Sequence, residues 1–260
     1  MTIGFIGVGH ITKAVVEGLC GDSGPPEPIL LSPRNAKVAA DLAARFDGVS
    51  VAADNQAVLD GAQTVVLAVL PPAAPEILGA LSFRPDHRIV SLIALRPQAE
   101  LAPLVAPATR ISRAVPLPSA ARRLGPVVYY PEDEAVAALL EHFGTPIAAE
   151  SESTFHRMWT LTSLVAPYYA LIGELMVWAE EGGVAPATAR AYLDSMFHTL
   201  GAMASGGATS YPNLAASAQT KGGINEQVMG ILAEHDALAP WREGVEAVFQ
   251  RMERGMAKAG

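Results

Sequence analysis

The sequence of 260 residues has little of several residue types, and each shortage excludes a class of protein. Cys20 is the single cysteine, so no disulfide can form within the chain. The net charge of −8 argues against sequence-independent binding to nucleic acid or to an anionic membrane. No group of His, Cys, Asp and Glu has the spacing of metal ligands in the sequence, so we predict no metal site.

Long apolar runs and a leader segment are also missing from the pattern. Proline or a charged residue interrupts the apolar stretches before the ~20 residues that a membrane-spanning helix needs, so we expect no membrane partner. A strand pattern already begins at Ile3, where a signal peptide would place its charged and apolar regions. Because 50% of the residues are apolar, we expect a soluble cytoplasmic protein with a sizeable core, in one large domain or two small ones.

The most informative stretch lies at the N-terminus, where an apolar strand runs into Gly7-Val8-Gly9 and a helical pattern follows at once. Glycines permit a tight turn and let the backbone approach a pyrophosphate, and the helix N-terminus presents N–H groups and partial positive charge. We therefore predict that Gly7, Gly9, His10 and Ile11 bind a dinucleotide cofactor. The third small position of this fingerprint is Thr12, and the alternative is a plain strand-to-helix turn.

The residues after the second strand bear on which cofactor is bound. An NAD site usually has Asp or Glu there, which accepts hydrogen bonds from the ribose hydroxyls. This chain has Ser32-Pro33-Arg34-Asn35, without a carboxylate, and Arg34 can form paired hydrogen bonds to a phosphate. We predict NADP rather than NAD, with Ser32 and Arg34 as contacts. The alternative for Arg34 is a solvated charge, although a cation at a helix start is slightly unfavourable.

Strand and helix patterns alternate through the first 150 residues, which predicts an N-terminal Rossmann domain with a doubly wound parallel sheet over residues 1–150. The carboxyl end of the fourth strand should lie beside the first, where ligands bind in such sheets. The expected strands are Ile3–Ile6, Ile29–Leu31, Val49–Val51, Thr64–Leu70, Arg88–Leu95 and Arg110–Val115, followed by Val127–Tyr130 and a short Pro146–Ala148.

Residues 151–260 change character and predict a second, all-helical domain. Thr154–Glu180 is long and apolar on several sides, and Ala185–Ser205 is amphipathic with a proline where a first helical turn tolerates one. Helices with more than one apolar face often pack against a second copy of the chain. We therefore expect a homodimer formed through this helical domain.

Several motifs along the chain resemble those of the pyrroline-5-carboxylate reductases, which reduce a cyclic imine to proline with NAD(P)H. The matching segments are Gly4–Gly9, Ser32–Asn35, Asp54-Asn55, Ala68–Pro71, Arg113–Pro116, Leu161–Tyr169 and Thr220–Asn225. The resemblance implies that Asn55 meets the adenosine part of the cofactor and that Ala68, Val69, Leu70 and Pro71 lie along it. It also implies that Ser163 borders the substrate pocket.

The departures from this family concern the substrate more than the cofactor. Leu70 replaces a lysine, Leu117 replaces an asparagine, and Ile224 and Asn225 stand where the family has two threonines. In the family, the loop that corresponds to Thr220–Gln227 holds the substrate carboxylate and touches the imine nitrogen. The resemblance therefore implies a small imino-acid substrate such as pyrroline-5-carboxylate, on a site whose substrate loop is altered.

The loop residues retain groups that reduction of a carbon–nitrogen double bond needs. Thr220, Lys221, Gly222 and Gly223 can offer hydroxyl, charge and N–H groups to a carboxylate, and we predict that they bind substrate. Asn225 can hydrogen-bond the nitrogen, and Glu226 can act as acid or base, so we predict both as catalytic. The alternative is a helix–loop–helix turn with Asn225 as a cap and Glu226 as a partner of the helix dipole.

Two other functions stay open from the sequence. The first is an NADP-dependent 3-hydroxyacid dehydrogenase of the same architecture, a family with a catalytic lysine in its interdomain helix. No lysine lies between Thr154 and Glu180 here, which counts against that reaction. The second is a non-catalytic NADP-binding protein with a regulatory role. The absence of both loop threonines supports this alternative.

Overall fold

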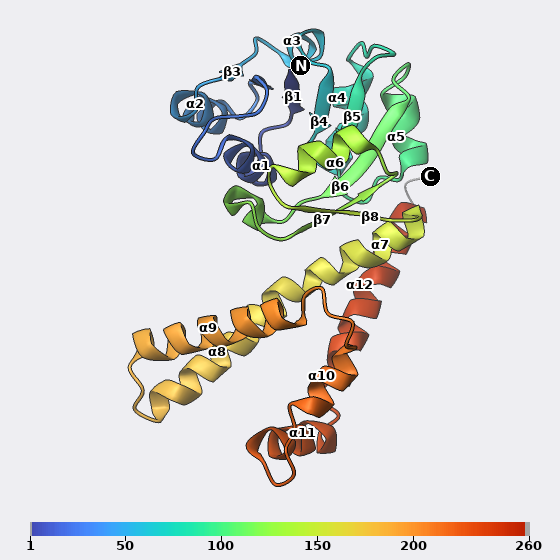
Figure 1. Ribbon diagram of the computed structural model, residues 1–260. Helices are drawn as coiled ribbons and strands as arrows, with labels where there is room; N and C mark the ends of the chain where they lie inside the picture. Colours follow the sequence, from blue (N-terminus) through green and yellow to red (C-terminus); the bar gives the residue numbers. More distant parts are fainter. Residues whose placement is uncertain (1, 258–260) are drawn as a thin grey trace. The chain divides into compact units, whose positions relative to one another are not determined.

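The computed structural model describes residues 2–257, and its first part is an eight-stranded sheet in the order β3-β2-β1-β4-β5-β6-β7-β8 (Figure 1). The chain starts in the middle of the sheet and moves outward in both directions from β1 and β4, which is the switch point of a doubly wound fold. The strands are β1 (Ile3–Ile6), β2 (Ile29–Leu31), β3 (Val49–Val51), β4 (Thr64–Leu67), β5 (Arg88–Ser91), β6 (Arg110–Val115), β7 (Pro126–Tyr130) and β8 (Thr145–Ala148).

The pairing is parallel from β3 through to β6, as the sequence predicts, but β7 runs antiparallel to β6. The expectation of a fully parallel sheet is wrong at this pair. Parallel strands need a long crossover, whereas the connection from Val115 to Pro126 holds only the short 3-10 segment η2 (Pro118–Arg122). The helix α6 (Glu134–Glu141) supplies such a crossover between β7 and β8, which are parallel.

Helices cover both faces of the sheet because successive strand side chains point to opposite sides. Phe5 packs in a core cluster with α1 (His10–Cys20), α2 (Ala36–Arg45) and α6, whereas Ile6 packs with α3 (Asn55–Gly61), α4 (Ala74–Gly79) and α5 (Gln98–Leu104). Two predicted strands end early. β4 stops at Leu67 and β5 at Ser91, and Leu95 has a φ of 56°, which no strand residue adopts.

The chain divides into two compact units. The first extends through Thr160 and also includes the residues from Phe249 onward, and the second is Leu161–Val248. The predicted domain boundary at residue 150 lies ahead of α7 (Glu152–Thr160), which belongs to the first unit. The last part of α12 (Ala239–Ala257) joins this unit because Phe249 and Met252 are buried in it, and the Thr160 hydroxyl lies 3.5 Å from Met252 Sδ.

The second unit consists of helices and their connecting loops, and none of its residues Leu161–Val248 lies in a strand. It contains η3 (Leu161–Leu164), α8 (Val165–Glu181), α9 (Pro186–Ala204), α10 (Tyr211–Ser217), α11 (Ile224–Glu234) and the first part of α12. α8 and α9 lie side by side (Figure 1), with the rings of Tyr168 and Phe197 edge to face at 5.9 Å. Pro167 and Pro186 each stand in a first helical turn, where the missing N–H has no intrahelical acceptor to lose.

The continuous helical stretch Glu152–Glu181 bears on the expectation that the protein has no membrane partner. It has 30 residues, and an 18-residue window within it has a mean hydropathy of 1.3, so by length and composition it is apolar enough to cross a membrane. A helix of this kind is weak evidence for a membrane, because helices that pack against protein pass the same test. Large apolar side chains are exposed along the second unit, including Trp178 at 75%, Tyr192 at 70% and Met203 at 76%.

Candidate functional site

The turn between β1 and α1 requires glycine at its first position. Gly7 has a φ of 96°, which side-chain-bearing residues rarely adopt. A Cβ on Gly7 would also lie 2.6 Å from the Ala68 carbonyl oxygen at the end of β4. The turn is therefore held closely against the neighbouring strand, at the switch point of the sheet.

The fold does not require glycine at position 9, where a side chain would have room. Gly9 is the N-cap of α1, its backbone is extended, and no atom lies within 4 Å of the place that a Cβ would take. No side chain caps this helix, whose first turn contains His10 and Ile11 and no acidic residue. The open space and the uncapped N–H groups fit the pyrophosphate of a dinucleotide.

Side chains outside the glycines hold the turn in this shape. Ser32 Oγ accepts a hydrogen bond from Gly7 N at 2.9 Å, Thr12 Oγ1 donates to Gly7 O at 2.7 Å, and Asn35 Nδ2 donates to Val8 O at 2.9 Å. Ser32 is 1% exposed, so its hydroxyl positions the turn. The sequence did not predict this role for Thr12 or Asn35, although each is a small polar residue within six positions of a strand end.

Arg34 lies at the carboxyl end of β2 with an exposed side chain. It has no hydrogen-bond or ion-pair partner among residues 2–257, and no carboxylate occurs from Ser32 to Asn35. A guanidinium in this place fits a phosphate on the adenosine ribose of a dinucleotide, because its planar donors match phosphate oxygens in pairs. The loop lacks the carboxylate that would accept bonds from two ribose hydroxyls.

The other predicted cofactor residues lie at the same edge of the sheet. Asn55 begins α3 after β3, where Asp54 caps the helix by accepting a hydrogen bond from Ala57 N at 2.8 Å. Ala68, Val69, Leu70 and Pro71 follow β4 directly. Leu70 is 76% exposed, an apolar side chain at the ligand-binding edge of the sheet. The structure thus brings the carboxyl ends of β1 to β4 and all eleven predicted cofactor contacts to one edge.

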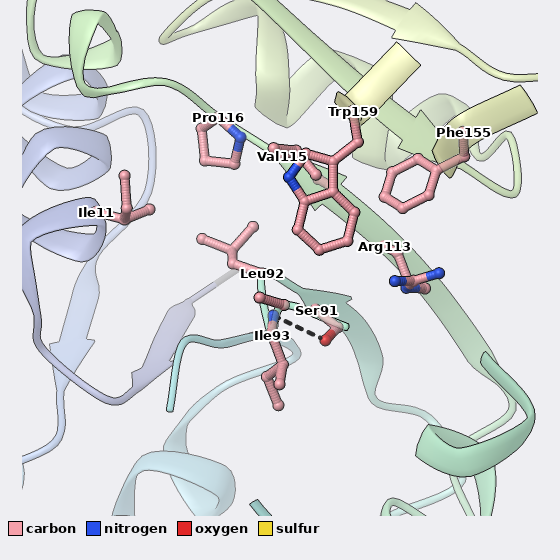
Figure 2. Close-up of a pocket in the computed structure, with 11 residues that line it drawn as sticks. Ile11, Ser91, Leu92, Ile93, Arg113, Val115, Pro116, Phe155 and Trp159 are labelled. Atoms are coloured by element: carbon pink, nitrogen blue, oxygen red, sulfur yellow. Dashed lines mark hydrogen bonds between the residues drawn. The ribbon is translucent and has the colours of Figure 1, made fainter. Parts of the chain in front are cut away.

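A cavity of about 190 Å³ continues along this edge, beyond the ends of β5 and β6. Figure 2 shows its wall, which includes Ile11 from α1, Leu92 and Ile93 after β5, Val115 at the end of β6, and Phe155 and Trp159 from α7. The wall is mainly apolar, and Ile11 belongs both to it and to the predicted cofactor turn. Among the residues that line this cavity, Arg113 carries a charge.

Arg113 forms a buried cluster that the sequence did not predict. The side chain is 1% exposed, and Nη1 donates to Glu152 Oε1 at 2.7 Å and to His156 Nε2 at 2.7 Å. Its Cζ lies 4.7 Å from the centre of the Phe155 ring. Glu152 Oε1 also accepts a hydrogen bond from Gln98 N at 2.9 Å, which ties the loop after β5 to this cluster. The signal in the sequence was an arginine inside an apolar strand, because a buried charge needs polar partners.

The hydrogen bonds of His156 define its protonation state. Arginine has only donors, so His156 Nε2 accepts from Arg113, and the ring hydrogen lies on Nδ1, which faces Glu253 Oε1 at 3.5 Å. Burial and the Arg113 charge lower the pKa of His156, while Glu152 and Glu253 oppose this shift. A second proton would point at the guanidinium, so the folded protein holds the ring neutral.

This neutral histidine predicts that stability falls at mildly acidic pH. The folded pKa lies below the unfolded value of about 6.5, so the contribution is fully present above about pH 6.5. It is lost as the pH falls through the folded pKa, with a slope of at most about 1.4 kcal/mol per pH unit. His156→Gln, which cannot titrate, should flatten the pH dependence of the unfolding free energy measured in urea between pH 7.5 and 5.

His198→Gln, at an exposed histidine of α9, is the control for this measurement. Since buried His87 also has a lowered pKa, mainly through desolvation, some pH dependence should remain in both variants. A slope unchanged by His156→Gln would contradict the assignment of a neutral His156.

The predicted substrate residues lie in the second unit. Ser163 is half-buried in η3 and lines an apolar hollow of about 340 Å³ with Pro167, Trp241 and Val248. In the loop before α11, Gly222 N donates to Glu226 Oε2 at 2.6 Å, and Asn225 Nδ2 donates to Ala218 O at 2.9 Å. Both predicted catalytic side chains therefore also stabilise the loop. Lys221 and Ile224 are exposed, and Thr220 O accepts a hydrogen bond from Gly223 N at 2.8 Å.

Comparisons with known proteins agree with this fold. Residues 2–95 match the family described as NADP oxidoreductase, coenzyme F420-dependent. A pyrroline-5-carboxylate reductase of Pseudomonas aeruginosa is 27% identical over 188 residues, which are 69% of this chain and 68% of the relative. The structure of the 1-pyrroline-5-carboxylate reductase from Streptococcus pyogenes superposes with a TM-score of 0.85 over 98% of both chains, at 21% identity.

The chain has the fold of the pyrroline-5-carboxylate reductases, and the sequence match supports its membership of that family. The same fold occurs in the Coxiella burnetii reductase, with a TM-score of 0.82 at 22% identity over 97% of both chains. It also occurs in the Plasmodium falciparum pyrroline carboxylate reductase with NADP bound, with a TM-score of 0.82 at 14% identity over 98% of both chains. These findings support an NAD(P)-dependent oxidoreductase similar to this family, with a Rossmann-like first unit and a helical second unit.

Proposed function

We propose that the protein transfers hydride from NADPH to the carbon–nitrogen double bond of a cyclic imino acid, with pyrroline-5-carboxylate as the first candidate and proline as its product. The observation that carries the proposal is the glycine turn of the first unit, open at Gly9 and uncapped at α1, with Arg34 alone in an acid-free loop beside it. The similarity to the pyrroline-5-carboxylate reductases supports the reaction class.

The residues of the first unit would orient the cofactor. When bound, NADPH supplies the hydride. The α1 N-terminus would hold the pyrophosphate through its N–H groups, and Arg34 would bind the 2′-phosphate. Ser32, Thr12 and Asn35 would keep the turn in the shape that the pyrophosphate needs, through the hydrogen bonds described above. Such fixed groups lower the barrier because the reacting carbon is positioned before the reaction begins.

The substrate would be bound by the loop Thr220–Gln227 and by Ser163, as the family resemblance implies. In this proposal Lys221 supplies positive charge for a carboxylate, and Asn225 or Glu226 serves the imine nitrogen, which must gain a proton as it gains electron density. For either role the side chain has to exchange its present partner, Ala218 O or Gly222 N, for the substrate.

The same two hydrogen bonds favour a second candidate, a non-catalytic protein that binds NADPH and serves regulation. If Asn225 and Glu226 only stabilise the loop, no side chain of the predicted catalytic pair is available for proton transfer. This candidate predicts NADPH binding without turnover.

We further propose that the protein is a homodimer formed through the second unit. The apolar side chains exposed on α8 and α9, among them Val177, Trp178, Tyr192 and Met203, would be covered by a second copy. Analytical ultracentrifugation should give twice the chain mass, and a monomer at micromolar concentration would contradict this assembly.

A substrate panel tests the proposed function. Purified protein is mixed with NADPH and, in separate reactions, with pyrroline-5-carboxylate, other cyclic imines and 3-oxoacids, and the loss of NADPH absorbance is followed. We expect turnover of at least one cyclic imine and of no 3-oxoacid, since no lysine lies between Thr154 and Glu180. Turnover of an oxoacid alone would refute imine reduction, and binding without any turnover would favour the regulatory candidate.

A further inference from the structure

The guanidinium of Arg113 has an unused edge inside the first unit. Its Nη1 is occupied by Glu152 and His156, but the buried Nε and Nη2 have no hydrogen-bond partner. These two nitrogens form one side of the guanidinium, with parallel N–H bonds at the spacing of two carboxylate oxygens. The free donors are therefore arranged as a fork for a bidentate acceptor.

The cost of leaving this edge empty is high. Unpaired buried donors lose their hydration without replacement, and the penalty is larger for a charged group. Burial lowers the pKa of Arg113, and only Glu152 and the more distant Glu100 oppose that effect. The Arg113 cation therefore has one carboxylate close by, that of Glu152, and its free edge can accept a second carboxylate. This favours an anionic ligand over a neutral one.

Arg113 also lines the cavity of about 190 Å³ shown in Figure 2. This volume is many times the roughly 10–15 Å³ that a single water needs, so a small ring molecule has space. The remaining wall is apolar, with Leu92, Val115 and Trp159 suited to the carbon atoms of such a ring. Ile11 places the cavity next to the predicted cofactor turn.

We propose that this cavity is a carboxylate-binding subsite, in which the Nε/Nη2 edge of Arg113 holds the carboxylate of a small ring acid. The inference rests on the proposed function, because it gives the imino-acid substrate an anchor other than the altered loop. Both nitrogens are buried, so the ligand has to displace a neighbouring ring from the fork. Trp159 is half-buried, with its ring centre 5.9 Å from Arg113 Cζ, and is the ring that we expect to move.

Binding to the cofactor-free protein tests the subsite without any turnover. Cyclopentanecarboxylate and cyclopentanecarboxamide have the same ring and nearly the same shape, and differ in charge. Calorimetry should show that the carboxylate binds and that Arg113→Lys, which keeps the charge but loses the fork, raises its dissociation constant at least tenfold. The carboxamide should bind more weakly and equally to both proteins. Arg88→Lys, at a strand arginine paired with Asp133, is the matched control and should change neither constant.

A second readout does not require the variant to fold well. In the ¹⁵N-labelled wild-type protein, the carboxylate should shift an arginine Nε–H resonance that is absent from Arg113→Lys. Equal binding of the acid and the amide, or acid binding unaffected by Arg113→Lys with no shifted Nε–H signal, would overturn the subsite. If the protein turns over an imine, the proposed function holds whether or not the subsite is overturned. If the acid binds in an Arg113-dependent way but no imine is turned over, the subsite holds and the proposed function does not.

Discussion

Replacing Gly9 with aspartate is expected to abolish NADPH binding while the fold stays intact. Gly9 has an extended backbone at the N-cap of α1 and open space where the side chain would stand. Aspartate is among the best N-cap residues, so helix stability should rise by a few tenths of a kcal/mol. Its carboxylate, however, would occupy the uncapped N–H groups and repel the pyrophosphate. We expect the dissociation constant for NADPH to rise at least about a hundredfold, or about 2.7 kcal/mol.

The measurement is a fluorescence titration with NADPH, paired with a thermal unfolding midpoint for each protein. Gly79→Asp is the control, since Gly79 also has no atom within 4 Å of a new Cβ and lies at the end of α4. It should bind NADPH like the wild type. If Gly9→Asp binds NADPH normally and is folded, the glycine turn does not hold the pyrophosphate.

Arg34→Ala is expected to weaken NADPH binding about tenfold to a hundredfold and to leave NADH binding within about twofold, because hydrogen bonds to charged groups contribute about 1.5–3 kcal/mol. Arg34 has no partner among the described residues, so its removal breaks no contact within the fold. The two cofactors differ only in the 2′-phosphate, and the ratio of their losses therefore reports on that group.

Arg110→Ala provides the control for net charge. Arg110 is an exposed arginine at the start of β6, and the starts of the parallel strands lie at the opposite edge of the sheet from Arg34. This variant should not discriminate between NADPH and NADH. Equal losses of both cofactors in Arg34→Ala would refute the phosphate role and remove the main argument for NADP.

The parts of the candidate site that can be predicted from the sequence depend on residues close together in the chain. Gly7 and Gly9 lie between a strand and a helix whose patterns are both local, so the turn between them can be inferred directly. The choice at Arg34 is also local, because it depends on which residue types follow β2. The support from Ser32 to Gly7 spans 25 positions, and it needs the pairing of β1 with β2 before it can be seen.

The antiparallel pairing of β7 could have been predicted from the connection alone. Leu117 to Gly125 is too short to hold a crossover helix, and the proline-rich start of that segment obscured this. The Arg113 cluster could not be predicted in the same way. Its hydrogen bonds to Glu152 and His156 span 39 and 43 positions, and Glu253 comes from the far end of the chain.

The roles of Asn225 and Glu226 show a different limit. An asparagine and a glutamate after a glycine pair fit both a substrate loop and a self-capped helix start, since the same donors and acceptors serve either purpose. The structure shows the capping contacts, Gly222 N to Glu226 and Asn225 to Ala218 O.

The most direct measurement of hydride transfer to an imine uses NADPH deuterated at both C4 positions. The protein is incubated with this cofactor and pyrroline-5-carboxylate, and the products are analysed by mass spectrometry. We expect proline that is heavier by one deuterium, on the carbon that formed the double bond, and no label without protein. If no cyclic imine of the panel acquires deuterium while NADPH binds normally, the chain does not reduce imines.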